Sequence, residues 1–553
     1  MVAVDEQPDD PRDTTPADAA RPGAAGPDDA PADAAPADAA APADAAAPSD
    51  AAAPAEAAPP DAAPTDAAAP AGRRLRPGTV LRRHPRATLV TAGALAFALL
   101  GGGAVAAGAA SVGTVAAPTA EGAPEPAPTV TVTTTPEAVP TEAPARALPA
   151  EVPAPTPLRT CSVAAAAADP RLGSFEGAVV DAATGEVLFD RSGSTPARTG
   201  SVMKTLTSAV ALSVLGPDHR LTTTVTGDAA SGSIALVGGG DATLSAGGGS
   251  VYPGAPTLSD LAGQVKASLG GAPVTAITLD STWWSTADEW DASWARSEQT
   301  IGYHSEVTAL QVDGDRATPS AQTSPRSTDP VGRAGEAFRR ALVAAGVPGA
   351  ATAPMTQGAA TSSTVLGTVR SQPVSSLVST LLPTSDNTLA EMLARASSKA
   401  AGSDGSAASL TGVYRQVLGS AYGLSVGDVT IVDGSGLSED NAVPATTMAR
   451  FMVQVGARQQ SLGTVLDALP VSGRSGTLAS RFTGPNAVAA GAVRAKTGWI
   501  DTAYTLSGTI QAQDGRQLTF AFYAIGNVRD SARAALDTLT TAVWSCGGDL
   551  TSA

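Results

Sequence analysis

The chain has 553 residues, of which 43% are hydrophobic and 16% charged, and its formal net charge is −17. Such an acidic chain is not a nucleic-acid binder that works through a basic face, and two cysteines are too few for a disulfide-stapled miniprotein. The charge is uneven, because residues 1–72 carry 15 acidic residues and only two arginines. The remainder that could fold, residues 158–553, is large enough for more than one domain.

The first 157 residues are expected to lack a folded domain. Within residues 1–86 a loose Pro-Ala-Asp-Ala-Ala unit recurs from Pro31 to Pro70, and the last 14 residues contain six arginines. This composition buries too little apolar surface to offset chain entropy, so we expect a disordered acidic cytoplasmic tail with a basic juxtamembrane end. Residues 113–157, rich in Pro, Thr, Ala and Glu, are expected to form an extended linker.

An uncharged segment separates these two stretches. Residues 87–112 contain no Asp, Glu, Lys or Arg and are long enough to cross a bilayer about 30 Å thick. The arginines lie on its N-terminal side, which predicts a cytoplasmic N-terminus and an extracytoplasmic folded region. A cleaved signal peptide is the alternative, because Ala-Val-Ala at 104–106 resembles a cleavage site, but the preceding stretch is far too long for one. We expect a signal-anchor helix, or a secreted protein if the segment is cleaved.

Export bears on the two cysteines. Cys161 lies at the start of the folded region and Cys546 near its end. In an oxidising compartment we expect them to form one disulfide that ties the two ends together, with two free thiols as the alternative.

The two ends of the folded region contain patterns of different kinds. Residues 175–181 and 186–190 flank Ala-Ala-Thr-Gly, which predicts a β-hairpin, and residues 201–215 predict a buried helix that Gly-Pro ends. Towards the C-terminus the sequence predicts three successive strands and a final helix, over 492–496, 503–512, 517–525 and 531–544. If the hairpin and the three strands share one sheet, the two chain ends meet.

Residues 222–375 differ in texture and predict an inserted, mostly β domain. It divides a catalytic domain into a first part, 158–221, and a second part, 376–553. The insert contains short β-like runs, one helical stretch near 331–345 and four tryptophans: Trp283, Trp284, Trp290 and Trp294. We expect the tryptophans to form a small hydrophobic core; a sugar-stacking platform is the alternative. The Gly run at 238–240 lacks a following Lys-Ser/Thr, so it predicts a tight turn rather than a phosphate loop.

Histidine and lysine are scarce. The three histidines form no cluster with metal-ligand spacing and no Cys-x-x-Cys occurs, so we expect neither a metal nor another cofactor. Only four basic residues are lysines: Lys204, Lys266, Lys399 and Lys496. Lysine, unlike arginine, loses its proton readily when buried, so each is a candidate for chemistry.

Two of these lysines lie in short motifs. Ser201-Val202-Met203-Lys204 places Ser and Lys on one face of a helix N-terminus, where the hydroxyl and the amine can touch and a neutral lysine can serve as base. Ser385-Asp386-Asn387 precedes a helical stretch and alone would be a helix cap. Lys496-Thr497-Gly498 lies at the end of a predicted strand and alone means little. The three in this order are the signature of class A β-lactamases and penicillin-binding proteins.

The sequence resembles the penicillin-recognising serine D,D-peptidases, and among them the D-Ala-D-Ala carboxypeptidase/endopeptidase family with a domain inserted between the first two motifs (low-molecular-mass class C). Further stretches carry the resemblance over about 160–548: SIALVGGGDATL, TSDNTLAEML, VDGSGLS and LPVSGRSGTLASRF. It implies an α+β fold, with a β-lactamase/transpeptidase-like antiparallel sheet flanked by helices. The long separation between Ser201 and Ser385 does not suit a compact class A β-lactamase.

The resemblance implies a role for each motif residue. Ser201 would attack the penultimate D-Ala carbonyl of a peptidoglycan stem peptide, and Lys204 would take its proton, with a pKa lowered by burial and by the charge of Lys496. Ser385 would relay the proton to the leaving nitrogen. Asn387 would orient Lys204 and the substrate amide. β-Lactams would stall the enzyme as an acyl adduct.

The same resemblance assigns the substrate-binding strand. Lys496 and Thr497 would hold the terminal carboxylate, and Gly498 completes the motif. The backbone N–H groups of Ser201 and Trp499 would form the oxyanion hole. Trp499 departs from the family pattern, which commonly has Thr or Ser there; the backbone donor survives, but a hydroxyl is lost and a large ring is added.

Two other functions fit the same motifs. A cell-wall-binding or sensor protein without catalytic activity would have the same fold. The residue that favours this alternative is Trp499, which replaces the usual hydroxyl residue after the Lys-Thr-Gly motif. A β-lactamase or esterase would use the same serine and lysine, although the sequence has no plausible deacylating Glu at the class A spacing. The expected partners are stem peptides, β-lactams and, through one helix, a membrane; nucleic acid is not expected.

Overall fold

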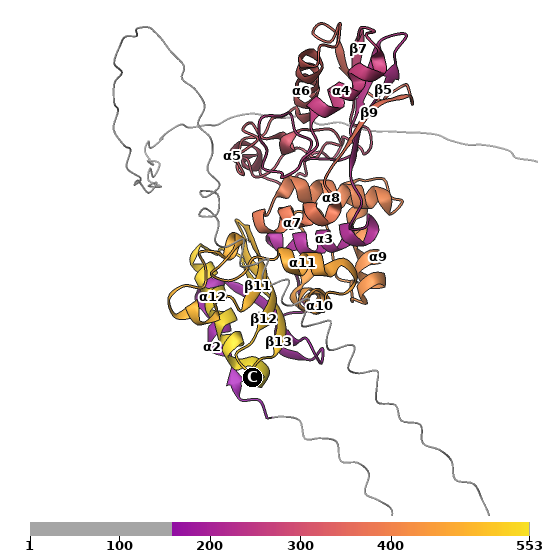
Figure 1. Cartoon of the computed structure of the whole chain (residues 1–553). Coiled ribbons are helices and arrows are strands. Elements are labelled where there is room, and N and C mark those ends of the chain that lie inside the picture. The colour runs from indigo at the N-terminus through magenta and orange to yellow at the C-terminus, as the bar shows by residue number, and fades with distance from the viewer. Residues whose placement is uncertain (1–157, 552–553) are drawn as a thin grey trace, which may run out of the picture. The chain divides into compact units, whose positions relative to one another are not determined.

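The computed structural model describes residues 158–551 (Figure 1). An antiparallel sheet organises the part that carries the two chain ends. Strands β11 (Val493–Ile500), β12 (Ala503–Gln511) and β13 (Gln517–Ile525) are hydrogen-bonded in that order. Strand β2 (Ser174–Asp181) lies beside β13 and pairs with β3 (Val187–Arg191). The predicted hairpin and the predicted three-stranded meander therefore share one sheet.

The two faces of this sheet pack against different helices. Phe522 belongs to a core shared with α12 (Ser531–Cys546), whereas the neighbouring Tyr523 belongs to a core shared with α3 (Met203–Val214) and α10 (Ala445–Gly456). Successive residues of a strand point to opposite faces, so β13 serves both cores. Because both faces are covered, β12 and β13 are buried along almost their whole length.

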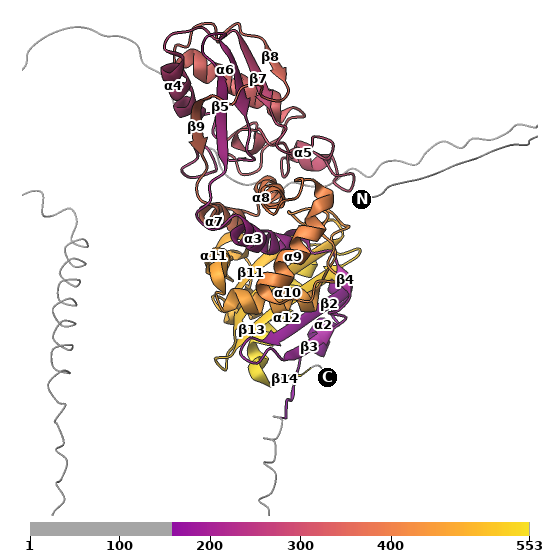
Figure 2. The same ribbon diagram turned by 90° about the vertical axis from the view of Figure 1, so that its right-hand side faces the viewer.

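Helix α3 lies at the centre of a helical layer (Figure 2). Ten of its twelve residues are buried, because helices pack on several of its sides. Its neighbours are α7 (Val374–Thr384), α8 (Asn387–Ala400), α9 (Leu410–Tyr422) and α11 (Gly463–Ala468).

The region between α3 and α7 forms a sheet of its own, in the strand order β8-β7-β6-β5-β9. The strands are β5 (Thr222–Asp228), β6 (Ser233–Val237), β7 (Ala276–Asp280), β8 (Met355–Gln357) and β9 (Val365–Arg370). Helices α4 (Leu258–Leu269) and α6 (Pro330–Ala344) pack on it. The prediction of a mostly β insert was wrong, because two long helices, α4 and α6, cover its sheet. Helix α4 was not predicted, and β6, β7 and β8 run parallel, an arrangement that needs long crossover connections.

The strands that enter and leave this insert are neighbours. β5 follows α3 and β9 precedes α7, and the two strands pair in antiparallel register. At their base the N–H of Ser371 donates to the Leu221 carbonyl (2.8 Å), and the Leu221 N–H donates to the Ser371 hydroxyl (2.9 Å). Because both connections lie side by side, the insert leaves the packing of α3 against α7 intact.

Two details of the insert can be compared with the sequence expectations, and one of them matches. Trp284 and Trp294 are buried in a small apolar cluster, against which Trp283 and Trp290 pack. The Gly run at 238–240 does not form the predicted tight turn: it follows β6, bends only at Gly240, and approaches other backbone closely, since a Cβ on Gly238 would lie 2.3 Å from the Ala309 oxygen. No side chain other than hydrogen fits there.

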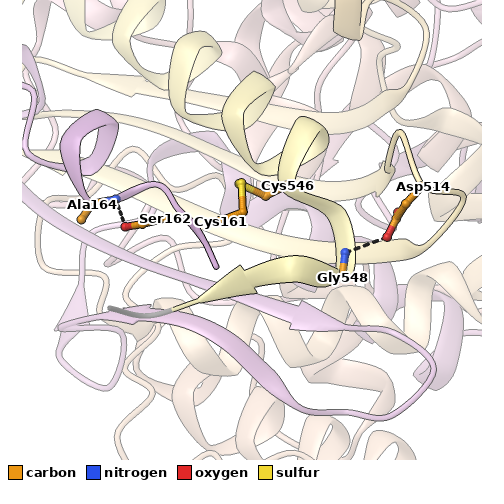
Figure 3. Close-up of a disulfide and its surroundings, with 6 residues drawn as sticks. All are labelled: Cys161, Ser162, Ala164, Asp514, Cys546 and Gly548. Atoms are coloured by element: carbon orange, nitrogen blue, oxygen red, sulfur yellow. Dashed lines mark hydrogen bonds between the residues drawn. A yellow bond between two sulfur atoms is a disulfide. The ribbon is translucent and has the colours of Figure 1, made fainter. Parts of the chain in front are cut away.

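The disulfide between Cys161 and Cys546 is present, as the sequence predicted (Figure 3). Cys546 is the last residue of α12, and Cys161 lies in the two-residue strand β1 (Cys161–Ser162). β1 pairs with β14 (Leu550–Thr551) just beyond the disulfide, so the ends of the folded region are joined twice.

The remaining short elements connect the main ones. They are α2 (Ala164–Ala167), α5 (Ser297–Ile301), β4 (Pro196–Ala197) and β10 (Val443–Pro444). Within residues 158–551 no helix is both long and apolar enough to cross a bilayer, and no group of His, Cys, Asp and Glu there could hold a metal ion. The predicted tail, anchor and linker, residues 1–86, 87–112 and 113–157, lie outside the described residues.

Candidate active site

The serine and lysine of the first motif are in direct contact. Ser201 lies on a single 3-10 turn, Gly200–Val202, that leads into α3, and Lys204 lies in the first turn of α3. The Lys204 Nζ is 2.8 Å from the Ser201 Oγ. The three-residue spacing places both side chains on the same face of the helix, as expected.

Two further acceptors hold the lysine. Lys204 Nζ donates to Asn387 Oδ1 (2.6 Å) and to the Ser435 carbonyl oxygen (2.7 Å). A neutral amine has two N–H groups and one lone pair, so these two acceptors use both N–H groups. The lone pair is then directed at the Ser201 hydroxyl, which is the geometry that a general base requires.

The environment of Lys204 favours the neutral form. The side chain is completely buried, and burial lowers its pKa to about 8, although the carboxylates of Asp433, Glu391 and Asp386 oppose the shift. Burial is thus the main cause, and the neighbouring charges that act on it most are negative rather than the positive charge expected from the sequence. With this pKa, about one amine in ten is neutral at pH 7.

The second and third motifs meet beside this pair. Ser385 follows α7 in a left-handed conformation (φ 59°), and its hydroxyl accepts a hydrogen bond from Lys496 Nζ (2.9 Å). Lys496 also donates to the Thr497 carbonyl and is completely buried. Burial and the nearby charge of Lys204 hold the pKa of Lys496 well below its ordinary value. The left-handed backbone of Ser385 is strained for a residue other than glycine, and strain of this kind is concentrated at functional sites.

The strand that carries Lys496 is longer than the sequence predicted. The Lys-Thr-Gly motif lies in the middle of β11, which continues to Ile500, and not at the end of a strand. A Cβ on Gly498 would lie 2.8 Å from the Ser201 nitrogen, and one on Gly200 would lie 3.1 Å from the Trp499 nitrogen. The two glycines let the strand approach the serine turn, so that the backbone nitrogens of Ser201 and Trp499 come close together.

These groups open into a cavity of about 490 Å³. One wall contains Ser201, Ser385, Asn387 and β11, and the other comes from the insert. Trp499 is 44% exposed, and its ring lies near that of Tyr504 (centroids 6.5 Å apart). The indole therefore stands at the cavity wall.

Asp386 has a structural role next to the site. Its Oδ1 accepts from the Leu389 N–H (3.1 Å), which caps α8, and its Oδ2 forms a buried salt bridge with Arg316 of the insert (2.7 Å). Burial would raise the Asp386 pKa, but the charges of Arg316 and Arg326, together with the hydrogen bonds from Leu389 and Arg316, outweigh burial and lower this pKa to about 2. The cap and the catalytic contact are thus made by adjacent residues, since Asn387 reaches Lys204.

Three residues at the site were not singled out from the sequence. Thr477 lines the cavity and its Oγ1 accepts from Thr497 Oγ1 (2.8 Å). Ser435 supplies a carbonyl to Lys204, and Glu391, one turn along α8 from Asn387, accepts from the Ser435 N–H (2.6 Å). Burial, with the charge of Asp433, raises the pKa of Glu391 to about 7. Each of the three residues lies in a stretch that resembles the family: Ser435 in VDGSGLS, Thr477 in LPVSGRSGTLASRF and Glu391 in TSDNTLAEML. That resemblance is the signal that could have identified them.

The sequence is similar to those of several bacterial carboxypeptidases. The chain is 36% identical over 403 residues to carboxypeptidase DacB of Mycolicibacterium smegmatis, covering 71% of this chain and 86% of that protein. It is 29% identical over 463 residues to a D-alanyl-D-alanine carboxypeptidase of Actinomadura sp. (strain R39), covering 69% and 83%.

A structural neighbour and a family profile agree with these relatives. The crystal structure of penicillin binding protein 4 from Haemophilus influenzae matches with a TM-score of 0.58 at 18% identity, over 69% of this chain and 98% of that one, which is a likeness of fold. The sequence profile of a peptidase family matches residues 159–326 and 316–543, which include all three motifs. By this match and the relatives' identity, the chain belongs to the D-Ala-D-Ala carboxypeptidase 3 (S13) family.

Proposed function

We propose that this protein is an extracytoplasmic serine D-Ala-D-Ala carboxypeptidase, held at the membrane by residues 87–112. It would remove the terminal D-Ala from peptidoglycan stem peptides and open D-Ala cross-links by the same chemistry. The observation that carries the proposal is the 2.8 Å contact between the Lys204 amine and the Ser201 hydroxyl, in a cavity that Ser385 also lines. Family membership and the names of the relatives support it.

Acylation uses the inner pair. Lys204 takes the Ser201 proton as Oγ forms a bond to the carbonyl carbon of the penultimate D-Ala. The negative charge that develops on the carbonyl oxygen is held by the backbone N–H groups of Ser201 and Trp499. The C–N bond then breaks, and the leaving nitrogen takes a proton through the Ser385 hydroxyl, which accepts a hydrogen bond from Lys496 (2.9 Å).

Substrate binding and deacylation use the outer groups. Lys496 and the linked hydroxyls of Thr497 and Thr477 bind the terminal carboxylate of the stem peptide: Thr497 donates to Thr477 (2.8 Å), and Thr477 donates to the carboxylate. The negative charge of the carboxylate favours the protonated form of Lys496 when substrate binds. After D-Ala leaves, water attacks the acyl-enzyme with Lys204 again as base and releases Ser201. A β-lactam acylates Ser201 in the same way but keeps its leaving group attached. A structure of the Haemophilus influenzae neighbour is described as complexed with a β-lactam, which supports β-lactams as ligands here.

The disulfide supports an extracytoplasmic location, because such bonds persist in oxidising compartments. The anchor itself is proposed from the uncharged stretch at 87–112 and the arginines that precede it.

The test is an intact-mass measurement on the full-length protein incubated with a penicillin, with Ser201→Ala alongside. We expect one stable adduct on the native chain, none on the variant, and release of D-Ala from a stem pentapeptide. Rapid β-lactam turnover without a stable adduct would indicate a β-lactamase. A folded protein with no adduct, no turnover and no D-Ala release would contradict the proposal and favour a wall-binding role.

A further inference from the structure

The insert contacts the two segments that hold Lys204, one with Asp386 and Asn387 and the other with Asp433 and Ser435. In Figures 1 and 2, α8 lies on the side of the helical layer next to the insert, near α5. The catalytic lysine has two acceptors apart from Ser201: the side chain of Asn387 and the backbone carbonyl of Ser435. A buried carboxylate precedes each acceptor by one or two residues, Asp386 before Asn387 and Asp433 before Ser435, and each carboxylate is hydrogen-bonded to a side chain of the insert.

The first link runs through Asp433. The Trp294 indole N–H donates to Asp433 Oδ2 (2.8 Å), and both residues are buried. The same carboxylate accepts the N–H groups of Gly436 and Ser438 (both 2.6 Å), which closes the loop around Ser435. The direction of the Ser435 carbonyl is therefore tied to a carboxylate that the insert orients.

The second link runs through Asp386. Arg316 Nη2 donates to Asp386 Oδ2 (2.7 Å), and the Tyr252 hydroxyl donates to the same oxygen (2.9 Å). The other carboxylate oxygen caps α8 at Leu389. Asn387 is the first residue of that helix, so its position depends on the cap.

Simple docking of the insert does not require such groups. Both side chains of the Arg316–Asp386 pair are 1% exposed, and apolar residues of similar volume stabilise a buried contact equally well or better. What buried, directional hydrogen bonds add is a fixed geometry. Here that geometry is used next to a base whose lone pair must point at one hydroxyl.

We propose that the insert positions the catalytic lysine: Trp294, Tyr252 and Arg316 hold the two loops whose acceptors direct the Lys204 lone pair at Ser201. These are positioning residues, because none of them touches Ser201 or Lys204 in the hydrogen bonds described. The inference rests on the proposed function, in which Lys204 is the base for acylation.

The test separates the chemical step from binding. Stopped-flow acylation of the full-length protein by a fluorescent penicillin yields the acylation rate constant and the dissociation constant of the preceding complex. Trp294→Phe removes the indole N–H but keeps an aromatic ring against His304, which Trp294 contacts edge-on at 4.5 Å. We expect the acylation rate constant to fall about tenfold and the dissociation constant to stay within twofold.

The matched control is Trp284→Phe. Trp284 belongs to the same apolar cluster, and its N–H donates to the Val307 carbonyl (3.2 Å), which has no link to Lys204. This variant loses the same atoms from the same cluster, so a general loosening of the insert would affect both. We expect its acylation rate constant to stay within twofold of the native value.

A second variant covers the other link, and covers failure of the first to fold. Tyr252→Phe removes only the hydroxyl that donates to Asp386, and we expect about a tenfold fall in the acylation rate constant alone. Its control is Tyr422→Phe, whose buried hydroxyl lies 3.5 Å from the Ala209 carbonyl. Folded Trp294 and Tyr252 variants that acylate at the native rate, or that change only the dissociation constant, would overturn the inference. A native chain that forms no adduct would instead overturn the proposed function.

Discussion

Lys496 donates to the Ser385 hydroxyl across 2.9 Å, which parallels the 2.8 Å contact between Lys204 and Ser201. The site therefore contains two serine–lysine pairs, and both lysines are completely buried. Two buried amines cannot both carry a full charge at low cost. One pair is suited to remove a proton from the nucleophile and the other to deliver a proton to the leaving group.

Loss of the outer hydroxyl should slow the chemical step. We expect Ser385→Ala to reduce kcat for D-Ala release about 10²-fold, because the proton must reach the leaving nitrogen without its relay. Steady-state hydrolysis of a stem pentapeptide measures this. Ser379→Ala is the control, since Ser379 bonds only within α7 (2.9 Å to the Ser375 carbonyl) and should keep native kcat. An unchanged kcat in Ser385→Ala would exclude the relay.

The pH dependence of acylation should report the Lys204 pKa. The neutral amine is the active form, and burial lowers this pKa to about 8, so the acylation rate should rise with pH and level off above about 8. Penicillin acylation measured from pH 6 to 10 tests this. Lys204→Arg should acylate at least 10³-fold more slowly at every pH, because arginine does not lose its proton. A rate that is independent of pH over this range would contradict the role of Lys204 as base.

Thr477 should contribute to carboxylate binding. Its Oγ1 accepts from Thr497, which leaves its own proton free for the substrate carboxylate, in a chain that has Trp499 where the family commonly has a hydroxyl. We expect Thr477→Val to raise KM for a stem pentapeptide about tenfold with a smaller change in kcat. Thr477→Ser restores the hydroxyl and should restore KM. Equal KM values for the Val and Ser variants would show that the hydroxyl does not bind substrate.

The disulfide should matter for stability and not for catalysis. Cys161 and Cys546 are 385 positions apart, so the bond restricts almost the whole unfolded chain of the folded region. We expect the Cys161→Ser, Cys546→Ser double variant to lose about 2–5 kcal/mol of unfolding free energy and to keep its acylation rate constant. Urea unfolding and penicillin acylation measure the two quantities. The reduced native protein should unfold like the variant, and unequal midpoints would mean that the serines perturb the fold by themselves.

The elements that the sequence predicted correctly are those whose signals lie close together along the chain. The helix that begins near Ser201 and the meander before α12 were predicted, since their periodicity and turn residues are local. Helix α4 was not predicted, although its signals are local: Thr257 caps it, Gly270 ends it, and the apolar residues between them recur at helical spacing (Leu258, Leu261, Ala262, Val265 and Leu269). The predicted strand with Lys496 is too short because Gly498 disfavours strand interior; the glycine allows the strand to approach Ser201.

By itself the sequence determined the family, the order of the three motifs, the contact of Ser201 with Lys204 and the pairing of the two cysteines. The motifs and the Ser201–Lys204 contact follow from short spacings along the chain, and the cysteine pairing follows because the chain has only two cysteines. Only the tertiary structure decided that Lys204 has Asn387 and the Ser435 carbonyl as acceptors, and that Trp294 and Arg316 of the insert reach the carboxylates beside them. Such contacts join residues at least 70 positions apart, and no local pattern encodes them, because they arise when separate elements pack and bury their polar groups together.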